Sequence, residues 1–165
     1  MDEGCVGKMK LSIKKGLGFG LTSGIITTLG MIVGFYSGTH SIKIIIGGIL
    51  LIALSDSLSD AFGIHISEEI NKQNSDKHIW ESTFSTLIFK IIFALSFTIP
   101  FLLFNITTAL TISLIWGLGL IAVFSYYITP KNESKVKVIG EHLFITIFVI
   151  IITYLIGQGI SGFFG

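Results

Sequence analysis

The chain contains no arginine, since all eleven of its basic residues are lysines. This absence argues against an anion site built from guanidinium groups. Charged residues are also scarce, at 13% of the 165 residues, against roughly 25% in soluble domains. The few lysines are dispersed along the chain, so they form no basic patch of the kind that binds nucleic acid.

The chain has a single cysteine, Cys5, which excludes an intrachain disulfide. The common catalytic motifs are missing too: there is no H-E-x-x-H, C-x-x-C, G-x-S-x-G or phosphate-loop pattern. A glycine-rich stretch at residues 16–20 leads into an apolar run rather than a strand–turn–helix unit, so it does not indicate nucleotide binding. We therefore expect neither an enzyme nor a bound cofactor.

Apolar sequence, by contrast, is abundant, at 51% of the residues. Five apolar runs each approach the roughly 20 residues that a helix needs to cross a bilayer. They are residues 17–36, 42–66, 83–105, 107–128 and 142–164. The first run is longer than a signal-peptide core and no A-x-A cleavage site follows it, so we expect it to be retained. The prediction is an all-α membrane bundle of five transmembrane helices.

We expect one membrane domain, residues 16–165, preceded by a basic tail at residues 1–15 that is disordered or lies at the interface. The only substantial interior polar segment is the loop at residues 67–82, where Trp80 is an expected interfacial anchor. The tail, this loop and the loop at residues 130–140 hold nine lysines between them, whereas the opposite side has only Lys43. The positive-inside rule then predicts a cytoplasmic N-terminus and an external C-terminus.

Two aspartates, Asp56 and Asp60, lie inside the second run. Residues four apart share one face of a helix, so the two carboxylates should stack. The same stripe is expected to hold three small or hydroxylated residues, Ser59, Gly63 and Ser67. A carboxylate in hydrocarbon is costly, so we expect this polar seam to face the protein interior. Acids inside a membrane are also functional candidates by default. The alternative is structural: the aspartates only pair with a buried lysine or join helices.

Lys90 in the third run is expected about 10 Å deep, level with Asp60. It could extend back to the interface on its long stem, which would leave both aspartates to hold a divalent ion. Alternatively it pairs with Asp60, and an arriving metal displaces the ammonium. We favour the first version. Two nearby carboxylates repel each other, which also favours exchange of a metal ion for protons.

Further acids gather toward the cytoplasmic end of the second run. Glu68 and Glu69 lie there with His65, and Glu81 ends the following loop. Carboxylates with imidazole suit Mn²⁺ and Fe²⁺ better than Cu⁺. This mouth is expected to concentrate cations, although acids at a helix end are often only solvated.

Glycines recur at four-residue spacing in the first run, at Gly30, Gly34 and Gly38 and again at Gly20 and Gly24. Such small faces let helix backbones approach closely, within one subunit or between two. Pro100 is expected to kink the third span.

Two stretches, GIITTLG at residues 24–30 and SLSDAFGIHISEE at residues 57–69, resemble the vacuolar iron transporter family, in particular its small prokaryotic members. The resemblance covers residues 16–69. It implies five spans with a cytoplasmic N-terminus, a homodimer in the prokaryotic plasma membrane, and exchange of Fe²⁺ or Mn²⁺ for protons. Ser23 stands where the family typically has an acid, and we expect Asp56 and Asp60 to replace the family's charged pattern.

The leading hypothesis is a transporter that moves a divalent metal ion out of the cytoplasm in exchange for protons. Two alternatives stay open. One is a non-transporting membrane subunit or scaffold whose aspartates hold helices together. The other is a channel for a monovalent cation or for protons.

Overall fold

In the computed structural model, residues 10–130 and 132–164 are described, and all regular secondary structure in that part of the chain is helical. Five helical segments there are long and apolar enough to cross a membrane. They are Leu11–Thr39, Ile42–Ile70, Asp76–Leu103, Ile106–Ile128 and Lys135–Phe163. The prediction of an all-α protein with five membrane-spanning segments is confirmed.

The chain divides into two compact units, which we describe one at a time. The first consists of the chain up to Gly24 together with Leu50–Ser96, and the second consists of Ile25–Ile49 and Phe97–Gly165. Helix α1 (Leu11–Thr39) is continuous and contributes its first half to one unit and its second half to the other.

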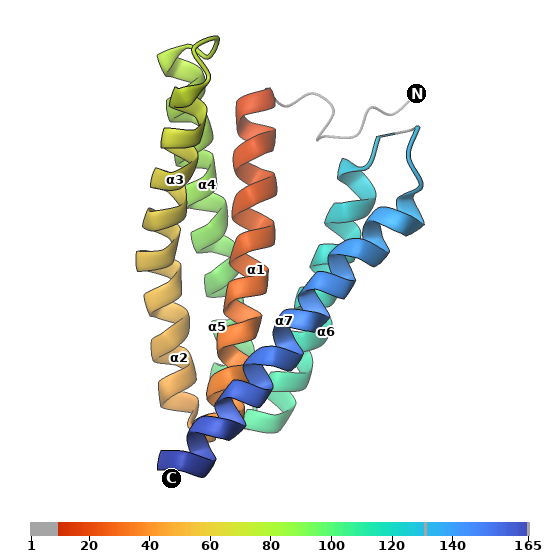
Figure 1. Ribbon diagram of the computed structural model, residues 1–165. Coiled ribbons are helices and arrows are strands. Elements are labelled where there is room, and N and C mark those ends of the chain that lie inside the picture. Colours follow the sequence, from red (N-terminus) through yellow and green to blue (C-terminus); the bar gives the residue numbers. More distant parts are fainter. Residues whose placement is uncertain (1–9, 131, 165) are drawn as a thin grey trace. The chain divides into compact units, whose positions relative to one another are not determined.

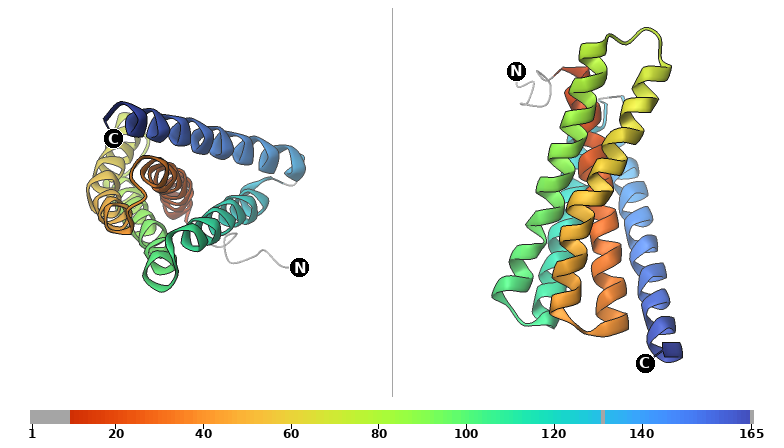
Figure 2. Two further views of the ribbon diagram at one scale, coloured as in Figure 1. Left: turned by 90° about the horizontal axis from the view of Figure 1, so that it is seen from below. Right: turned by 90° about the vertical axis from the view of Figure 1, so that its left-hand side faces the viewer.

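The first unit is built on the hairpin of α3 (Ser57–Ile70) and α4 (Asp76–Ser96), which pack against each other. A short turn at residues 71–75 joins them, and the two helices run side by side in yellow and green in Figures 1 and 2. A π-helical turn, Ile52–Asp56, precedes α3 and also contacts α4. The polar loop expected at residues 67–82 is therefore mostly helical, with only this turn between the helices.

The first half of α1 lies close against α4 because glycines face it. A Cβ atom on Gly16 would lie 2.7 Å from the main-chain oxygen of Ser82, and one on Gly20 would lie 2.7 Å from that of Thr86. Any side chain would push the two backbones apart, so glycine permits this approach. The small face expected around Gly20 is thus a contact between α1 and α4.

The second unit contains α2 (Ile42–Leu51) up to Ile49, the short α5 (Thr98–Leu103), α6 (Ile106–Ile128) and α7 (Lys135–Phe164). Helix α6 packs against both α5 and α7. Figure 1 shows α6 and α7 in cyan and blue.

The second glycine stripe of α1 lies against α7 of the same chain. A Cβ atom on Gly34 would lie 3.4 Å from the main-chain oxygen of Thr153, and one on Gly38 would lie 3.2 Å from that of Gly157. Gly30 likewise faces α7. This stripe is therefore occupied within the subunit. The homodimer stays a prediction and would need another surface.

Three helices, α1, α4 and α7, begin well before the apolar runs suggested. Helix α1 begins at Leu11, so residues 11–15 are helical and do not belong to an irregular tail, while residues 1–9 lie outside the described part. Helix α7 begins at Lys135 instead of residue 142. The reason is that hydropathy marks only the part of a helix suited to lipid, and charged residues extend the helix beyond it.

Both prolines end helices. Helix α4 ends at Ser96, four residues before Pro100, because the proline ring clashes with the carbonyl group at that distance. The expected distortion of the third span is thus a break between α4 and α5. Helix α6 ends at Ile128, just before the residue that precedes Pro130, because α geometry is disfavoured at that position.

Candidate functional site

The second span contains a π-helical turn, and Asp56 is its last residue. Within Ile52–Asp56 the helix is wider than α, and the main-chain N–H of Ser57 bonds to the oxygen of Ile52, five residues back. The wider turn changes the angular positions of the side chains that follow it, compared with a regular α-helix. π turns of this kind occur frequently at functional sites.

The buried face of α3 differs from the expected polar seam. Its buried residues are Ser57, Ala61 and Glu68. The three residues expected to line the seam are exposed instead: Ser59, Gly63 and Ser67. That expectation was wrong because α3 packs against α4 through the face that holds Ser57 and Ala61. Each of these residues follows an aspartate by one position, so this face is turned by roughly 100° from the aspartates. The aspartates lie at the edge of this face, with side chains 36% exposed for Asp56 and 22% for Asp60.

Lys90 of α4 stands between the two aspartates. Its side chain is fully buried, and its Nζ lies 2.5 Å from Asp56 Oδ2. The same Nζ forms an ion pair and hydrogen bond with Asp60 Oδ2. It also donates a hydrogen bond to Ser23 Oγ at 3.1 Å, while Ser23 Oγ donates to Asp60 Oδ2 at 2.6 Å. One ammonium group is therefore shared by two carboxylates and a hydroxyl.

Helix α1 completes this group through two adjacent residues. Ser23 supplies the hydroxyl, and Gly24 leaves room for the lysine stem, since a Cβ atom there would lie 3.2 Å from Lys90 Cγ. In the sequence, Ser23 is recognisable only as a departure from a family pattern. A single hydroxyl beside a glycine in an apolar run was the available signal, and it is a weak one because many membrane helices contain such pairs.

The geometry decides between the two versions considered for Lys90. The lysine does not extend to the interface; it pairs with Asp60, and with Asp56 as well. A buried ammonium is tolerated when opposite charges and hydrogen bonds compensate its desolvation. With both carboxylates ionised, the three side chains carry a net charge of −1.

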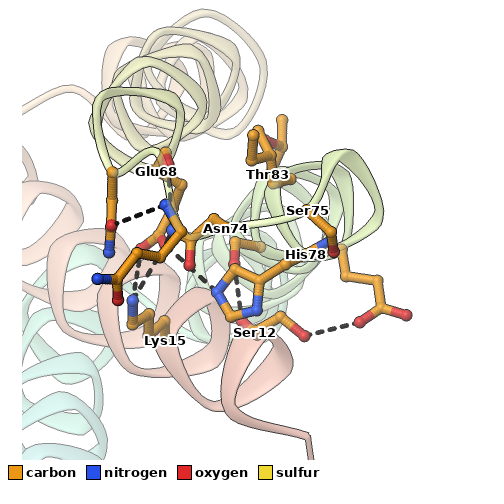
Figure 3. Close-up of polar contacts among 12 residues, drawn as sticks. Ser12, Lys15, Glu68, Asn74, Ser75, His78 and Thr83 are labelled. Atoms are coloured by element: carbon orange, nitrogen blue, oxygen red, sulfur yellow. Dashed lines mark hydrogen bonds and ion pairs between the residues drawn. The ribbon is translucent and has the colours of Figure 1, made fainter.

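A second polar cluster, drawn in Figure 3, centres on Glu68, whose side chain is largely buried. Lys15 Nζ of α1 donates to both carboxylate oxygens at 3.0 Å. Asn74 Nδ2, from the turn after α3, donates to Oε2 at 2.7 Å and to the Glu68 main-chain oxygen at 3.1 Å. His78 Nε2 of α4 lies 3.3 Å from Oε2. Glu68 thus connects α1, the turn and α4.

The other residues expected at the mouth are dispersed. Glu81 accepts hydrogen bonds from Lys10 and Ser12, each at 2.7 Å. His65 Nδ1 lies 3.1 Å from Thr83 Oγ1 and its ring packs on Trp80, while Glu69 is exposed. Among residues 10–130 and 132–164, no group of three or more His, Cys, Asp or Glu side chains is placed to hold a metal ion.

No family model matches the chain, and neither a curated protein nor a solved structure matches it. The resemblance to vacuolar iron transporters therefore stays an expectation, and function has to be argued from the site. What the fold and geometry establish is a multi-pass helical membrane protein that buries a lysine between two aspartates.

Proposed function

We propose that this protein transports a cation across the membrane, and that Asp56 and Asp60 are the groups that accept it. The observation that carries the proposal is the convergence of both carboxylates on one positive charge, the Lys90 ammonium, inside membrane-spanning helices. A pair of carboxylates that holds one cation offers oxygen ligands to another. Acids placed inside a membrane commonly mark ion pathways.

The substrate class follows from the chemistry of the three oxygen donors. Carboxylate oxygens and the Ser23 hydroxyl suit a divalent ion such as Mn²⁺ or Fe²⁺, and no soft thiolate or thioether is present in the group. Asp56 and Asp60 are partly exposed, whereas Lys90 is buried. An incoming ion would approach the carboxylates from their exposed side and displace the ammonium, which would return when the ion leaves.

The direction and coupling of transport rest on the sequence. The lysine distribution predicts a cytoplasmic N-terminus, and the family resemblance implies export of metal in exchange for protons. When the ion leaves and the ammonium returns, the group still carries one negative charge, which a proton can neutralise. We therefore propose outward metal transport coupled to inward proton movement.

Flux into proteoliposomes tests the proposal. Purified protein is reconstituted with a pH gradient, and entry of Mn²⁺ and Fe²⁺ is followed with a metal-quenched fluorophore inside the vesicles. We expect Asp56→Asn and Asp60→Asn each to abolish metal flux, whereas Asp76→Asn, an exposed carboxylate at the start of α4, leaves it unchanged. Full transport by the Asp56→Asn, Asp60→Asn double variant would end the proposal.

The Lys90 pair also favours a second candidate, a pathway for protons or a monovalent cation. An ammonium held by two carboxylates is itself a singly charged cation, and lysine–aspartate pairs can exchange protons without a metal. Vesicles that carry a pH gradient but no metal distinguish the two. Proton flux that needs Asp56 and Asp60 but is indifferent to Mn²⁺ would favour this candidate, and no flux of either kind would favour a structural role for the aspartates.

A further inference from the structure

An apolar groove lies along α4 in the first unit, and its lining residues on this helix come directly before Lys90. Its volume is about 450 Å³. Its lining includes three apolar residues from successive turns of α4, Trp80, Phe84 and Ile88, and Ile13 of α1. Lys77 belongs to the lining and lies one turn before Trp80.

The groove has the length of one membrane leaflet. Lys77 and Ile88 are eleven residues apart on one helix, which corresponds to about 16 Å along its axis. The hydrocarbon core of a bilayer is about 30 Å thick, so one leaflet takes up about half of it. Trp80 lies near the polar end, as is usual for tryptophan at an interface. A single extended acyl chain matches these dimensions.

Charges of both signs lie at the polar end: Lys77 and Glu81 belong to the lining, and Asp76 is exposed beside Lys77. Glu81 is the other charged residue of the groove, and it already accepts hydrogen bonds from Lys10 and Ser12 of α1. The exposed Lys77 ammonium is therefore the cationic group of the lining that can bind a headgroup phosphate. One lysine near a membrane surface raises the binding constant for an anionic lipid about fivefold.

We propose that this groove is a binding site for an anionic glycerophospholipid, with one acyl chain along Trp80, Phe84 and Ile88 and the headgroup phosphate at Lys77. An ordinary lipid-facing surface would accept any headgroup, whereas this site combines an apolar groove as long as one acyl chain with an exposed lysine at its end. The proposal is independent of the transported ion.

Tryptophan quenching tests it, because the chain has only two tryptophans. The Trp116→Phe variant leaves Trp80 inside the groove as the sole reporter. It is reconstituted with brominated phosphatidylglycerol or with brominated phosphatidylcholine of the same acyl composition. We expect phosphatidylglycerol to associate with the Trp80 site about fivefold more strongly, and Lys77→Gln to abolish this preference.

Two controls make the result specific. Lys72→Gln removes an exposed lysine from the nearby turn and should leave the preference intact. The reciprocal Trp80→Phe variant reports from Trp116 and should show equal quenching by both lipids. Equal quenching of Trp80 by the two lipids would overturn the proposal, and so would a preference that survives Lys77→Gln.

Discussion

The ammonium of Lys90 lies 2.5 Å from Asp56 Oδ2 and also pairs with Asp60, so the two carboxylates share one cation. This sharing distinguishes the site from a simple lysine–aspartate pair. Removing the lysine would leave two carboxylates facing each other in a membrane-spanning region. Removing one aspartate would leave Lys90 paired with the carboxylate of the other.

Lys90→Met should therefore destabilise the protein more than either aspartate substitution. We expect a loss on the order of 2 kcal/mol, below the value for a fully buried pair because both carboxylates are partly exposed. Thermal unfolding in detergent would measure it, with Lys43→Met at the exposed start of α2 as the control. Adding Asp60→Asn to Lys90→Met should recover part of the loss, and an unchanged melting temperature for Lys90→Met would contradict this interpretation.

Two glycines near the end of α7 provide a matched test of helix packing in the second unit. A Cβ atom on Gly157 would lie 2.2 Å from the main-chain oxygen of Gly34, whereas one on Gly159 would meet nothing within 4 Å. Gly157→Ala should destabilise the protein by about 2 kcal/mol through overpacking. Gly159→Ala should be neutral or slightly stabilising, since alanine is the better helix former. Similar melting temperatures for the two variants would show that α1 and α7 are not packed this closely.

Adjacent glutamates test the cluster around Glu68. Glu68→Gln removes a charge that binds Lys15 and the Asn74 side chain, so the turn at residues 71–75 should open more often. Amide hydrogen exchange in this turn should become about tenfold faster, which corresponds to the loss of charge-assisted hydrogen bonds. Glu69→Gln, at an exposed neighbour, should leave exchange unchanged. Equal effects of the two changes would mean that Glu68 does not hold the turn.

Membrane topology can be tested with single cysteines in a Cys5→Ser background. Asn74→Cys and Asn132→Cys lie in the two lysine-bearing loops and should react with an impermeant thiol reagent only from the cytoplasmic side. A cysteine at Gly165 should react only from outside, because five spans place the two termini on opposite sides. Labelling of Asn74→Cys from outside would reverse the orientation and the proposed direction of transport.

Several features of the site were predictable because they depend on short-range sequence. Asp56 and Asp60 are neighbours on one helix by their spacing alone, and helical rise placed Lys90 at the level of Asp60. Ser23 was missed because its partners, Asp60 and Lys90, are far away in the chain. Asn74 was missed because its bonds to the nearby Glu68 depend on how the chain folds back at the turn. The preference for an extended Lys90 also failed, since sequence gives the depth of a side chain in the membrane but not the direction in which it points.

Hydropathy by itself determined the five spans, and the two prolines determined where α4 and α6 end. Both features depend on local chemistry. Only the tertiary structure decided which face of each helix is buried. The close approach of α1 and α4 at Gly16 and Gly20, together with the π turn that ends at Asp56, sets the directions in which the side chains of these helices point. Those directions bring Lys90 between two carboxylates and turn Ser59 outward, and they arise from contacts between residues that no local pattern connects.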